Sequence, residues 1–363
     1  LDFGRYSNRF DYLDEKYLGV DIGDIVLVRI KGRLVNGLVV EKNIFQNNSK
    51  AEFKYLSIEK IIEKTVFQPW WREWIVQMAI FYKVSELKMF KTALPPGWIG
   101  KSNIRSEIST KIWITFNNDG DKSQYKLTVK QSSLLEKVKS QKGEWQSTLI
   151  KQGFSSQQIN TLISKGILNK TKRQKAVNIS LNSYKSSSPK KKIPILTLQQ
   201  KKAIRGIQDM KYGEALLLWG ETGSGKTEVY LRIAESQLIL NKSCLILAPE
   251  IGLIPQLIDR FADKFKKNIF EYHSNCSPKY RQTVWREILN ASEPLIVIGT
   301  RSSIFLPIKN LGIIILDEEH DNSYKQENPM PCYDAREVAI DRSKVVNSKI
   351  VFGTATPSLS IWK

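Results

Sequence analysis

The chain has 363 residues, of which 41% are hydrophobic, and a formal net charge of +20. This length suits two or three domains, and no apolar run reaches the roughly 18 residues of a membrane span. The N-terminus does not have the pattern of a signal peptide, so we expect a cytoplasmic protein with no membrane partner. Cys244, Cys276 and Cys332 lie far apart in the sequence, which argues against a disulfide framework and against a complete set of zinc ligands.

Most of the excess positive charge lies in one middle segment. Residues 145–208 hold thirteen basic residues and no acidic residue, whereas residues 209–363 hold nineteen of each. A basic block of this kind suits a polyanion such as nucleic acid. A solvated, lysine-rich linker is the alternative, and it stays open for residues 186–193.

The first segment, residues 1–97, is predicted to be a small β-rich domain. Residues 24–30 and 35–40 are rich in β-branched side chains and are separated by turn residues, which indicates an antiparallel sheet. Pro69 then opens a predicted helix. Its apolar side chains recur at helical spacing, which is more typical of a core face than of a base-stacking platform: Trp71, Trp74, Ile75, Met78, Ala79 and Tyr82.

The second segment, residues 98–185, ends in a pattern of helix, turn, helix and strand. Residues 144–151 form the first predicted helix, and Ser155 with Gln158 is a capping box that starts the second. Gly166 ends this second helix and a strand begins at Ile167. This order is the outline of a winged helix, in which residues 171–175 would be a basic wing.

The third segment, residues 194–363, alternates apolar strand-like runs with helical runs. Such alternation predicts a parallel sheet that is covered on both faces, and the expected fold class is therefore multidomain α/β. The predicted strands are residues 215–219, 244–248, 295–298, 311–316 and 350–352.

Residues 220–227 carry the chemistry that is easiest to interpret. Gly220, four residues and then Gly225-Lys226-Thr227 match the P-loop pattern G-x-x-x-x-G-K-[ST]. Glycines let backbone N–H groups point at a phosphate, and the start of a helix adds its positive end. Lys226 would supply charge to the β- and γ-phosphates of ATP, and the Thr227 hydroxyl would be a ligand for Mg²⁺.

Acidic residues follow a second apolar run, at residues 313–316. The carboxyl edge of a parallel sheet is where such folds bind ligands. Asp317 is therefore expected to hold Mg²⁺, and Glu318 to act as the general base for the attacking water. His320 is expected to couple the nucleotide to the next motif, the segment 353–357 with Thr354 and Thr356, whose small residues and hydroxyls fit a relay of the nucleotide state.

Two further segments follow predicted strands, residues 248–252 and residues 299–302. Backbone amides there, together with Arg301, could reach phosphates, although a plain loop remains the alternative for either segment alone.

Taken together, these motifs resemble the PriA family of replication restart helicases. The resemblance rests on GETGSGKTEVYL (220–231), APEIGLIPQ (248–256), GTRSSIFLP (299–307), ILDEEHDNSYKQE (315–327) and GTATPSL (353–359). It implies a domain that captures the 3′ end of DNA, a winged helix, and one RecA-like helicase lobe, in that order. The family binds forked DNA and works with primosome proteins and single-stranded DNA-binding protein, so a nucleoid-associated location is expected.

The resemblance also implies roles for individual residues. Gly223, Ser224 and Gly225 would join Gly220, Lys226 and Thr227 around the ATP phosphates, and Gln200 stands where such helicases often read adenine. The 3′-terminus pocket would include Asp11 and Gly32. Other nucleic-acid contacts are expected from the basic residues Lys170, Lys172, Arg173 and Arg301.

Two departures from the family pattern leave alternatives open. Cys332 and Asp334 interrupt the expected aromatic-rich loop, and the chain stops ten residues after Gly353. Family members continue with zinc-binding cysteine pairs and a second lobe with arginine fingers, so zinc is expected only beyond Lys363. The alternatives are a DNA-fork-binding module with a vestigial ATP pocket, and another superfamily 2 translocase or RNA helicase.

Overall fold

The structure is a computed structural model that describes residues 9–43, 55–101, 110–117, 128–140, 143–174, 195–265 and 268–362. The chain divides into two compact units, one formed by Leu1–Ser102 with Ile179–Lys363 and the other by Asn103–Asn178. The predicted linker at residues 186–193 lies outside the described residues. Among the helices that are described, none is long and apolar enough to cross a membrane.

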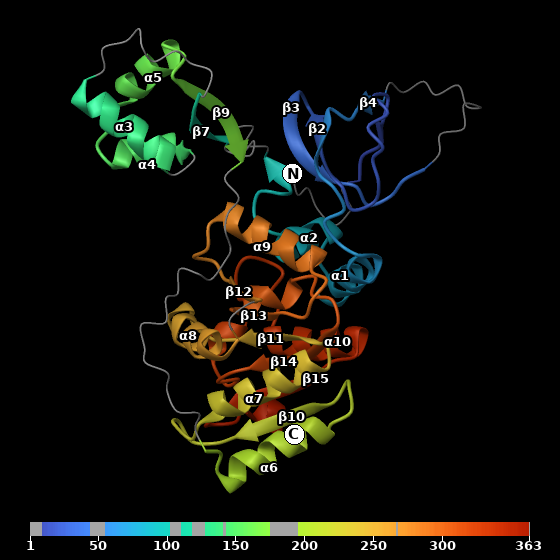
Figure 1. Ribbon diagram of the computed structural model, residues 1–363. Helices are drawn as coiled ribbons and strands as arrows, with labels where there is room; N and C mark the ends of the chain where they lie inside the picture. The colour runs from blue at the N-terminus through green and yellow to red at the C-terminus, as the bar shows by residue number, and fades with distance from the viewer. Residues whose placement is uncertain are drawn as a thin grey trace. The chain divides into compact units, whose positions relative to one another are not determined.

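The N-terminal part of the first unit contains the antiparallel sheet that the sequence predicts. Its strand order is β5-β2-β3-β6, and β1 pairs with β4 in a separate parallel pair. Figure 1 labels β2, β3 and β4 in this part of the chain. Lys31 and Gly32 both have positive φ angles at the tip of the β2–β3 hairpin, as a tight right-twisted turn requires. The strands are β1 (Tyr12–Leu13), β2 (Ile25–Ile30), β3 (Arg33–Leu38), β4 (Leu56–Ser57), β5 (Lys60–Glu63) and β6 (Gly100–Lys101).

Two helices lie between β5 and β6 in the chain. Helix α1 (Pro69–Phe81) begins at Pro69 as predicted, and its apolar stripe is buried from Trp71 to Ala79. Helix α2 (Glu86–Ala93) begins where the Ser85 hydroxyl accepts the N–H of Lys88. The stripe therefore belongs to a core, as its spacing predicts.

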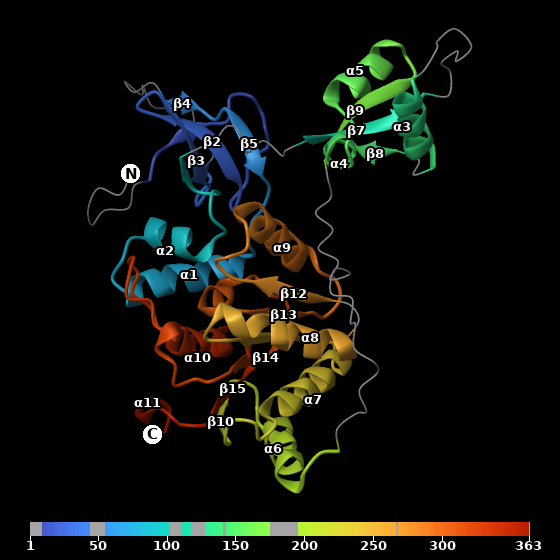
Figure 2. The ribbon, with the colours of Figure 1, turned by 90° about the vertical axis from the view of Figure 1, so that its left-hand side faces the viewer.

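The rest of the first unit is a parallel α/β lobe. Its six strands follow the order β10-β15-β14-β11-β13-β12, and helices cover both faces of the sheet (Figure 2). The strands are β10 (Ala215–Trp219), β11 (Ser243–Leu247), β12 (Ile269–Tyr272), β13 (Ile296–Gly299), β14 (Leu311–Leu316) and β15 (Lys349–Thr354). The helices are α6 (Leu198–Asp209), α7 (Lys226–Ile239), α8 (Ile254–Lys264), α9 (Pro278–Asn290), α10 (Ala335–Val346) and α11 (Leu359–Trp362). Short 3₁₀ turns are η3 (Ile251–Leu253), η4 (Arg301–Phe305) and η5 (Asn322–Tyr324).

Five of the six strands were predicted, and the edge strand β12 was missed. Only four residues long, β12 includes Glu271, so it has no continuous apolar run to reveal it. It pairs on one side only, with β13. An edge strand with one polar side chain is hard to separate from a loop by periodicity alone.

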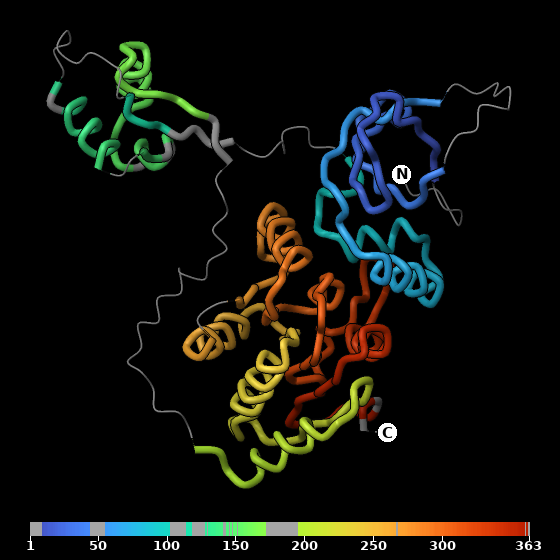
Figure 3. Tube along the Cα trace, turned by 45° about the vertical axis from the view of Figure 1, so that its right-hand side comes forward, coloured from blue at the N-terminus to red at the C-terminus, as the bar shows by residue number. Residues whose placement is uncertain are grey.

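The two faces of the sheet are packed differently. Aliphatic side chains of α6, α7 and α8 cover one face. The opposite face packs against α9 and α10 and also against α1 and α2, which come from the N-terminal part of the chain. The blue segment of α1 and the red segment of α10 accordingly run side by side in the trace (Figure 3).

Four indole rings hold this second face together, and we call Trp71, Trp74, Trp98 and Trp285 the tryptophan seam. The rings of Trp71 and Trp285 meet edge to face at 5.5 Å, and Trp98 meets Trp285 at 5.8 Å. Trp71 Nε1 donates to the carbonyl oxygen of Phe305 at 2.7 Å, and Trp74 Nε1 donates to Asp341 at 2.8 Å. The seam therefore joins residues more than two hundred positions apart into one core.

Within its described residues, the second unit contains three helices and a three-stranded antiparallel sheet in the order β8-β7-β9. Residues 144–145 form a strand, so the helix predicted for residues 144–151 begins only at Gln146. The predicted capping box at Ser155 and Gln158 is present. The elements are β7 (Thr110–Phe116), α3 (Val129–Ser140), β8 (Glu144–Trp145), α4 (Gln146–Lys151), α5 (Ser156–Ser164) and β9 (Leu168–Gln174).

Candidate functional site

The P-loop lies between β10 and α7, at the carboxyl edge of the parallel sheet. Gly223 and Gly225 have φ angles of 82° and 87°, which glycine adopts without strain. Gly225 is the N-cap of α7, so Lys226 stands in the first turn of the helix. The loop therefore presents the N-terminus of a 14-residue helix, which favours anions.

Lys226 points back into the loop and across to the acidic strand end. Its ammonium donates to the carbonyl oxygen of Gly220 at 2.9 Å and lies 3.3 Å from a carboxylate oxygen of Glu318. Only 9% of its side chain is exposed. Residues 220–227 and Glu318, predicted as parts of one site, are thus brought together.

Gln200 reaches the P-loop from α6. Its amide nitrogen donates to the carbonyl oxygen of Ser224 at 3.0 Å, and its amide oxygen accepts the N–H of Thr197. A Cβ at Gly225 would collide with this amide nitrogen. The contact fixes α6 against the loop, and the role of Gln200 in reading adenine stays a prediction.

Asp317 stands at the end of β14, where the sequence places it. The hydroxyl of Tyr230 donates to its Oδ1 at 2.9 Å. Burial raises the pKa of Asp317, and the Glu318 charge acts in the same direction, while Tyr230 and Lys226 oppose the shift. A second cation such as Mg²⁺ beside Asp317 would relieve this cost of burying its charge.

Glu318 has a φ angle of +45°, an uncommon conformation for a residue with a side chain. One carboxylate oxygen faces Lys226, and the other lies 3.8 Å from Nδ1 of His320. Such backbone strain often persists at functional sites. Here it accompanies a carboxylate placed between the P-loop lysine and the next motif.

The predicted coupling residues form a continuous chain. Nδ1 of His320 lies 2.9 Å from the hydroxyl of Thr354, and the N–H of Thr356 donates to that hydroxyl at 3.1 Å. The side chains therefore connect Glu318, through His320, to the segment after β15.

Three residues that support the site were not predicted. Tyr230 holds Asp317, and a Cβ at Gly353 would strike its hydroxyl. The buried Tyr324 hydroxyl donates to the carbonyl oxygen of Asp317 at 2.6 Å. Glu319 is fully buried and accepts both the N–H and the hydroxyl of Ser358. The only sequence signal was their place inside the matched motifs.

The residues present fit a nucleotide with Mg²⁺. The loop offers backbone N–H groups, a helix N-terminus and the Lys226 ammonium, which complement phosphates. The half-buried Thr227 and the Asp317 carboxylate supply hard oxygen ligands of the kind that Mg²⁺ prefers. Gly220, Gly223, Ser224, Gly225, Lys226 and Thr227 would hold the phosphates, and Thr227 with Asp317 the metal ion.

A groove of about 600 Å³ lies where β11, β12 and β13 end, next to α2. Arg301 lies in it and donates to the carbonyl oxygens of Ser323 and Lys325, at 3.0 and 3.1 Å. Its guanidinium also forms a hydrogen bond with the side chain of Tyr333, which lines the same groove. The groove combines the two predicted loop segments with α2 through Pro249, Ile251, Thr300, Arg301, Lys88 and Lys91.

The remaining predicted DNA contacts lie elsewhere. Asp11 is exposed just before β1, and Gly32 is exposed at the β2–β3 turn. In the second unit, Lys170 is exposed on β9, and the backbones of Lys172 and Arg173 pair with Ile112 and Lys111 on β7.

Comparison with known proteins defines the class first. Residues 197–361 match the family described as DEAD/DEAH box helicase, and residues 4–95 match the family described as 3′DNA-binding domain (3′BD). The parallel lobe with its P-loop and acidic strand end is therefore a DEAD/DEAH box helicase domain, with use of a nucleotide and Mg²⁺, and it follows a 3′ DNA-binding domain.

The relatives define the family more closely. The replication restart protein PriA of Synechocystis sp. is 43% identical over 66% of this chain and 28% of its own length. PriA of Haemophilus influenzae is 30% identical over 96% of this chain and 48% of its own length. Among solved structures, the Hef helicase domain of Pyrococcus furiosus is 20% identical over 45% of this chain and 33% of that chain, with a TM-score of 0.36. The chain is similar to these PriA proteins over most of its own length and spans between a quarter and a half of theirs.

Proposed function

We propose that the chain provides the fork-binding and ATP-binding parts of an ATP-dependent 3′→5′ DNA helicase that restarts replication and initiates primosome assembly. The observation that carries this proposal is the contact between Lys226 and Glu318, continued through His320 to Thr354. It links the phosphate-binding loop to the acidic strand end and to the segment that follows β15. A vestigial pocket would have no need of this arrangement.

Each residue of the cleft then has a specific role. ATP with Mg²⁺ supplies the phosphoanhydride bond whose hydrolysis drives movement along DNA. Lys226 neutralises phosphate charge, and Thr227 and Asp317 hold the metal ion. Glu318 orients and deprotonates the attacking water. Because Lys226 pairs with Glu318 at 3.3 Å, transfer of the lysine to phosphate would release the carboxylate for this task.

The other modules bind the fork. The N-terminal domain would hold the 3′ end of DNA near Asp11 and Gly32. The second unit would be a winged helix, because α4, α5 and the β8-β7-β9 sheet follow that order of elements. Lys170, Lys172 and Arg173 on β9 would contact phosphates, and Arg301 would contact DNA in the groove. The same proposal includes primosome proteins and single-stranded DNA-binding protein as partners, a nucleoid location, and zinc in the region of the relatives that this chain does not span.

The nucleotide part is tested by calorimetric titration of the 363-residue chain with ATP and Mg²⁺. We expect saturable binding that Glu318→Gln retains and Lys226→Ala weakens. Hydrolysis by this chain alone should be slow, because arginine fingers of a second lobe are typically worth about 10³–10⁵ in rate. Rapid, DNA-stimulated hydrolysis that Glu318→Gln abolishes would contradict the need for the second lobe.

The DNA part is tested by comparing two forks that differ in one group. A fork with a free 3′-OH should bind more tightly than the same fork phosphorylated at that end, because the added charge must enter the pocket. The difference should shrink in Asp11→Ala. Equal affinity for the two forks in the unaltered chain would count against a 3′-end pocket at Asp11.

A further inference from the structure

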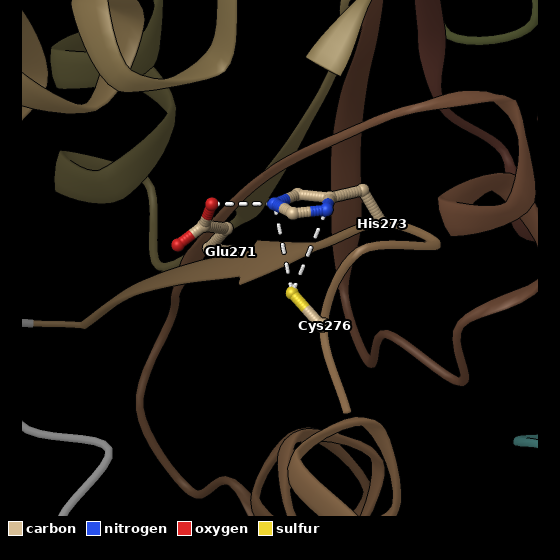
Figure 4. Close-up of side chains that lie close together, drawn as sticks. All are labelled: Glu271, His273 and Cys276. Carbon is tan, nitrogen blue, oxygen red and sulfur yellow. Dashed lines mark hydrogen bonds and ion pairs between the residues drawn. The ribbon is translucent and has the colours of Figure 1, made fainter. Parts of the chain in front are cut away.

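A cluster of three ligand-type side chains lies outside the nucleotide cleft, at the end of the edge strand β12. The side chains of Glu271, His273 and Cys276 converge there (Figure 4). Nε2 of His273 lies 2.5 Å from a carboxylate oxygen of Glu271, and the Cys276 sulfur lies 3.6 Å from the same nitrogen. One ligand atom from each of the three residues lies within 4.8 Å of the others.

Local structure explains why the three meet. Glu271 and His273 are two residues apart along the strand direction, so their side chains leave on the same side. Tyr272 between them is buried in the opposite core with the tryptophan seam. The chain then turns, with the N–H of Cys276 donating to the carbonyl oxygen of His273 at 3.1 Å. This turn brings the thiol back over the imidazole.

The segment that carries the cluster is fixed at both ends. The carbonyl oxygen of Tyr272 accepts the hydroxyl of Ser303 at 2.7 Å. On the far side, the Ser277 hydroxyl caps α9 by accepting the N–H of Tyr280 at 3.2 Å. His273 is buried, and Glu271 and Cys276 are partly exposed. The cluster is therefore preorganised and accessible from one side.

We propose that Glu271, His273 and Cys276 bind one Zn²⁺ ion, with the fourth position open to water. Thiolate, imidazole and carboxylate together suit a borderline-soft dication, whereas Mg²⁺ and Ca²⁺ prefer oxygen ligands alone. Zinc bonds to these atoms are about 2.0–2.3 Å long, so ligand atoms of a tetrahedral site lie roughly 3–4 Å apart. Only small rotations of the three side chains are needed, chiefly to open the contact between Glu271 and His273.

The other two cysteines provide internal controls. Cys244 is fully buried in the sheet, where burial raises its pKa, and so no metal ion reaches it as a thiolate. The exposed Cys332 lies beside Met330, and within the described part of the chain it belongs to no cluster of metal-ligand side chains. Non-specific binding to thiols would favour the exposed Cys332, whereas the proposed site requires Cys276.

The test is a zinc titration of the 363-residue chain after treatment with a chelator, followed by competition with a chromophoric chelator. We expect one Zn²⁺ per chain, and a loss of affinity on the order of 100-fold in Cys276→Ser and in His273→Gln, since even outer contacts are worth about 10–100-fold. Glu271→Gln should lose less, and Cys332→Ser should behave as the unaltered chain. At saturating concentrations, Co²⁺ should give a thiolate charge-transfer band that His273→Gln retains and Cys276→Ser lacks.

Several outcomes overturn the proposal. These are less than one Zn²⁺ per chain, unchanged affinity in Cys276→Ser, or an equal loss in Cys332→Ser. Circular dichroism of each variant separates a missing ligand from a missing fold, and Glu271→Gln supplies a third variant if one of the others is unfolded. Because ATP is absent throughout, the result does not depend on the proposed helicase function.

Discussion

The nucleotide cleft and the tryptophan seam lie at the same sheet, but the cleft contains charged side chains and the seam contains buried aromatic rings. The cleft, formed by residues 220–227, 317–320 and 354, keeps charged groups partly buried and pairs them with one another. The seam buries four indole rings, and the backbone carbonyl oxygens of Phe305 and Val66 accept the indole N–H groups of Trp71 and Trp285. The charged groups of the cleft can exchange their ion pairs for contacts with a ligand, whereas the contacts of the seam are permanent.

This difference teaches where stability and binding reside. Burying large aromatic side chains stabilises the fold directly. Burying a carboxylate such as Asp317 is unfavourable until a cation arrives. Substitutions in the seam should therefore reduce stability and leave ATP affinity intact in folded molecules, and substitutions in the cleft should do the reverse.

The largest effect is expected at the centre of the seam. Trp285→Ala removes a fully buried ring that contacts Trp71 and Trp98, so the free energy of unfolding should fall by about 3–5 kcal/mol. Urea denaturation measures the change. Phe81→Ala on α1 is the matched control, because Phe81 is 67% exposed, and it should cost less than about 1 kcal/mol. Similar losses in the two variants would contradict the seam.

A smaller loss, of binding and not of stability, is expected at the P-loop. Lys226→Ala removes the ammonium from the phosphate site, and charged hydrogen bonds contribute about 1.5–3 kcal/mol, or roughly 10–150-fold in Kd. Calorimetric titration with ATP and Mg²⁺ measures this change. Lys201→Ala on the exposed side of α6 serves as the control. Unchanged ATP affinity in Lys226→Ala would remove the basis for the cleft.

Asp317→Asn should change fold stability and ATP binding in opposite directions. Burial raises the pKa of Asp317, so its folded carboxyl holds a proton more tightly than the unfolded one does, and stability is lost as pH rises through the folded pKa. The amide has no such loss. Relative to the unaltered chain, the variant should therefore gain stability between acid and neutral pH, while Mg²⁺ no longer strengthens ATP binding. Denaturation at a series of pH values tests the first part, and a falling stability difference would contradict it.

The smallest effect is expected at the basic residues of segment 170–175. Replacing Lys170, Lys172, Arg173 and Lys175 by Ala should reduce the salt dependence of DNA binding, by a slope of about 0.9 for each duplex phosphate that is no longer neutralised. Fluorescence anisotropy at several salt concentrations measures the slope. An unchanged slope would favour a solvated surface, and Lys137→Ala with Lys139→Ala on α3 is the charge-matched control for two of the four changes.

Sequence patterns predict which residues form each helix or strand and which face is buried, but not which residues of other elements pack against that face. The P-loop and the acidic strand end follow from the spacing of residues within sequence motifs. The buried face of α1 follows from helical periodicity. Spacing does not say what covers that side. The contact of Trp71 with Trp285, and that of Tyr230 with Asp317, depend on tertiary packing across distant segments. The short edge strand β12 is not predicted for a related reason. Its four residues have no clear strand pattern, and they form a strand by pairing with β13.

The central claim is that ATP binding resides in the cleft and fold stability in the seam. The direct test is urea denaturation of three proteins: the unaltered chain, Lys226→Ala and Trp71→Phe. Each is measured without nucleotide and with ATP and Mg²⁺ at about 100 times the Kd of the unaltered chain. The nucleotide should add about 2.7 kcal/mol to the unaltered chain and to Trp71→Phe, which starts about 1–3 kcal/mol lower because Phe305 loses its N–H partner. In Lys226→Ala the increment should fall to about 0.3–1.4 kcal/mol, which corresponds to the roughly 10–150-fold loss of affinity expected above. A normal increment in Lys226→Ala, or its loss in Trp71→Phe, would contradict the account.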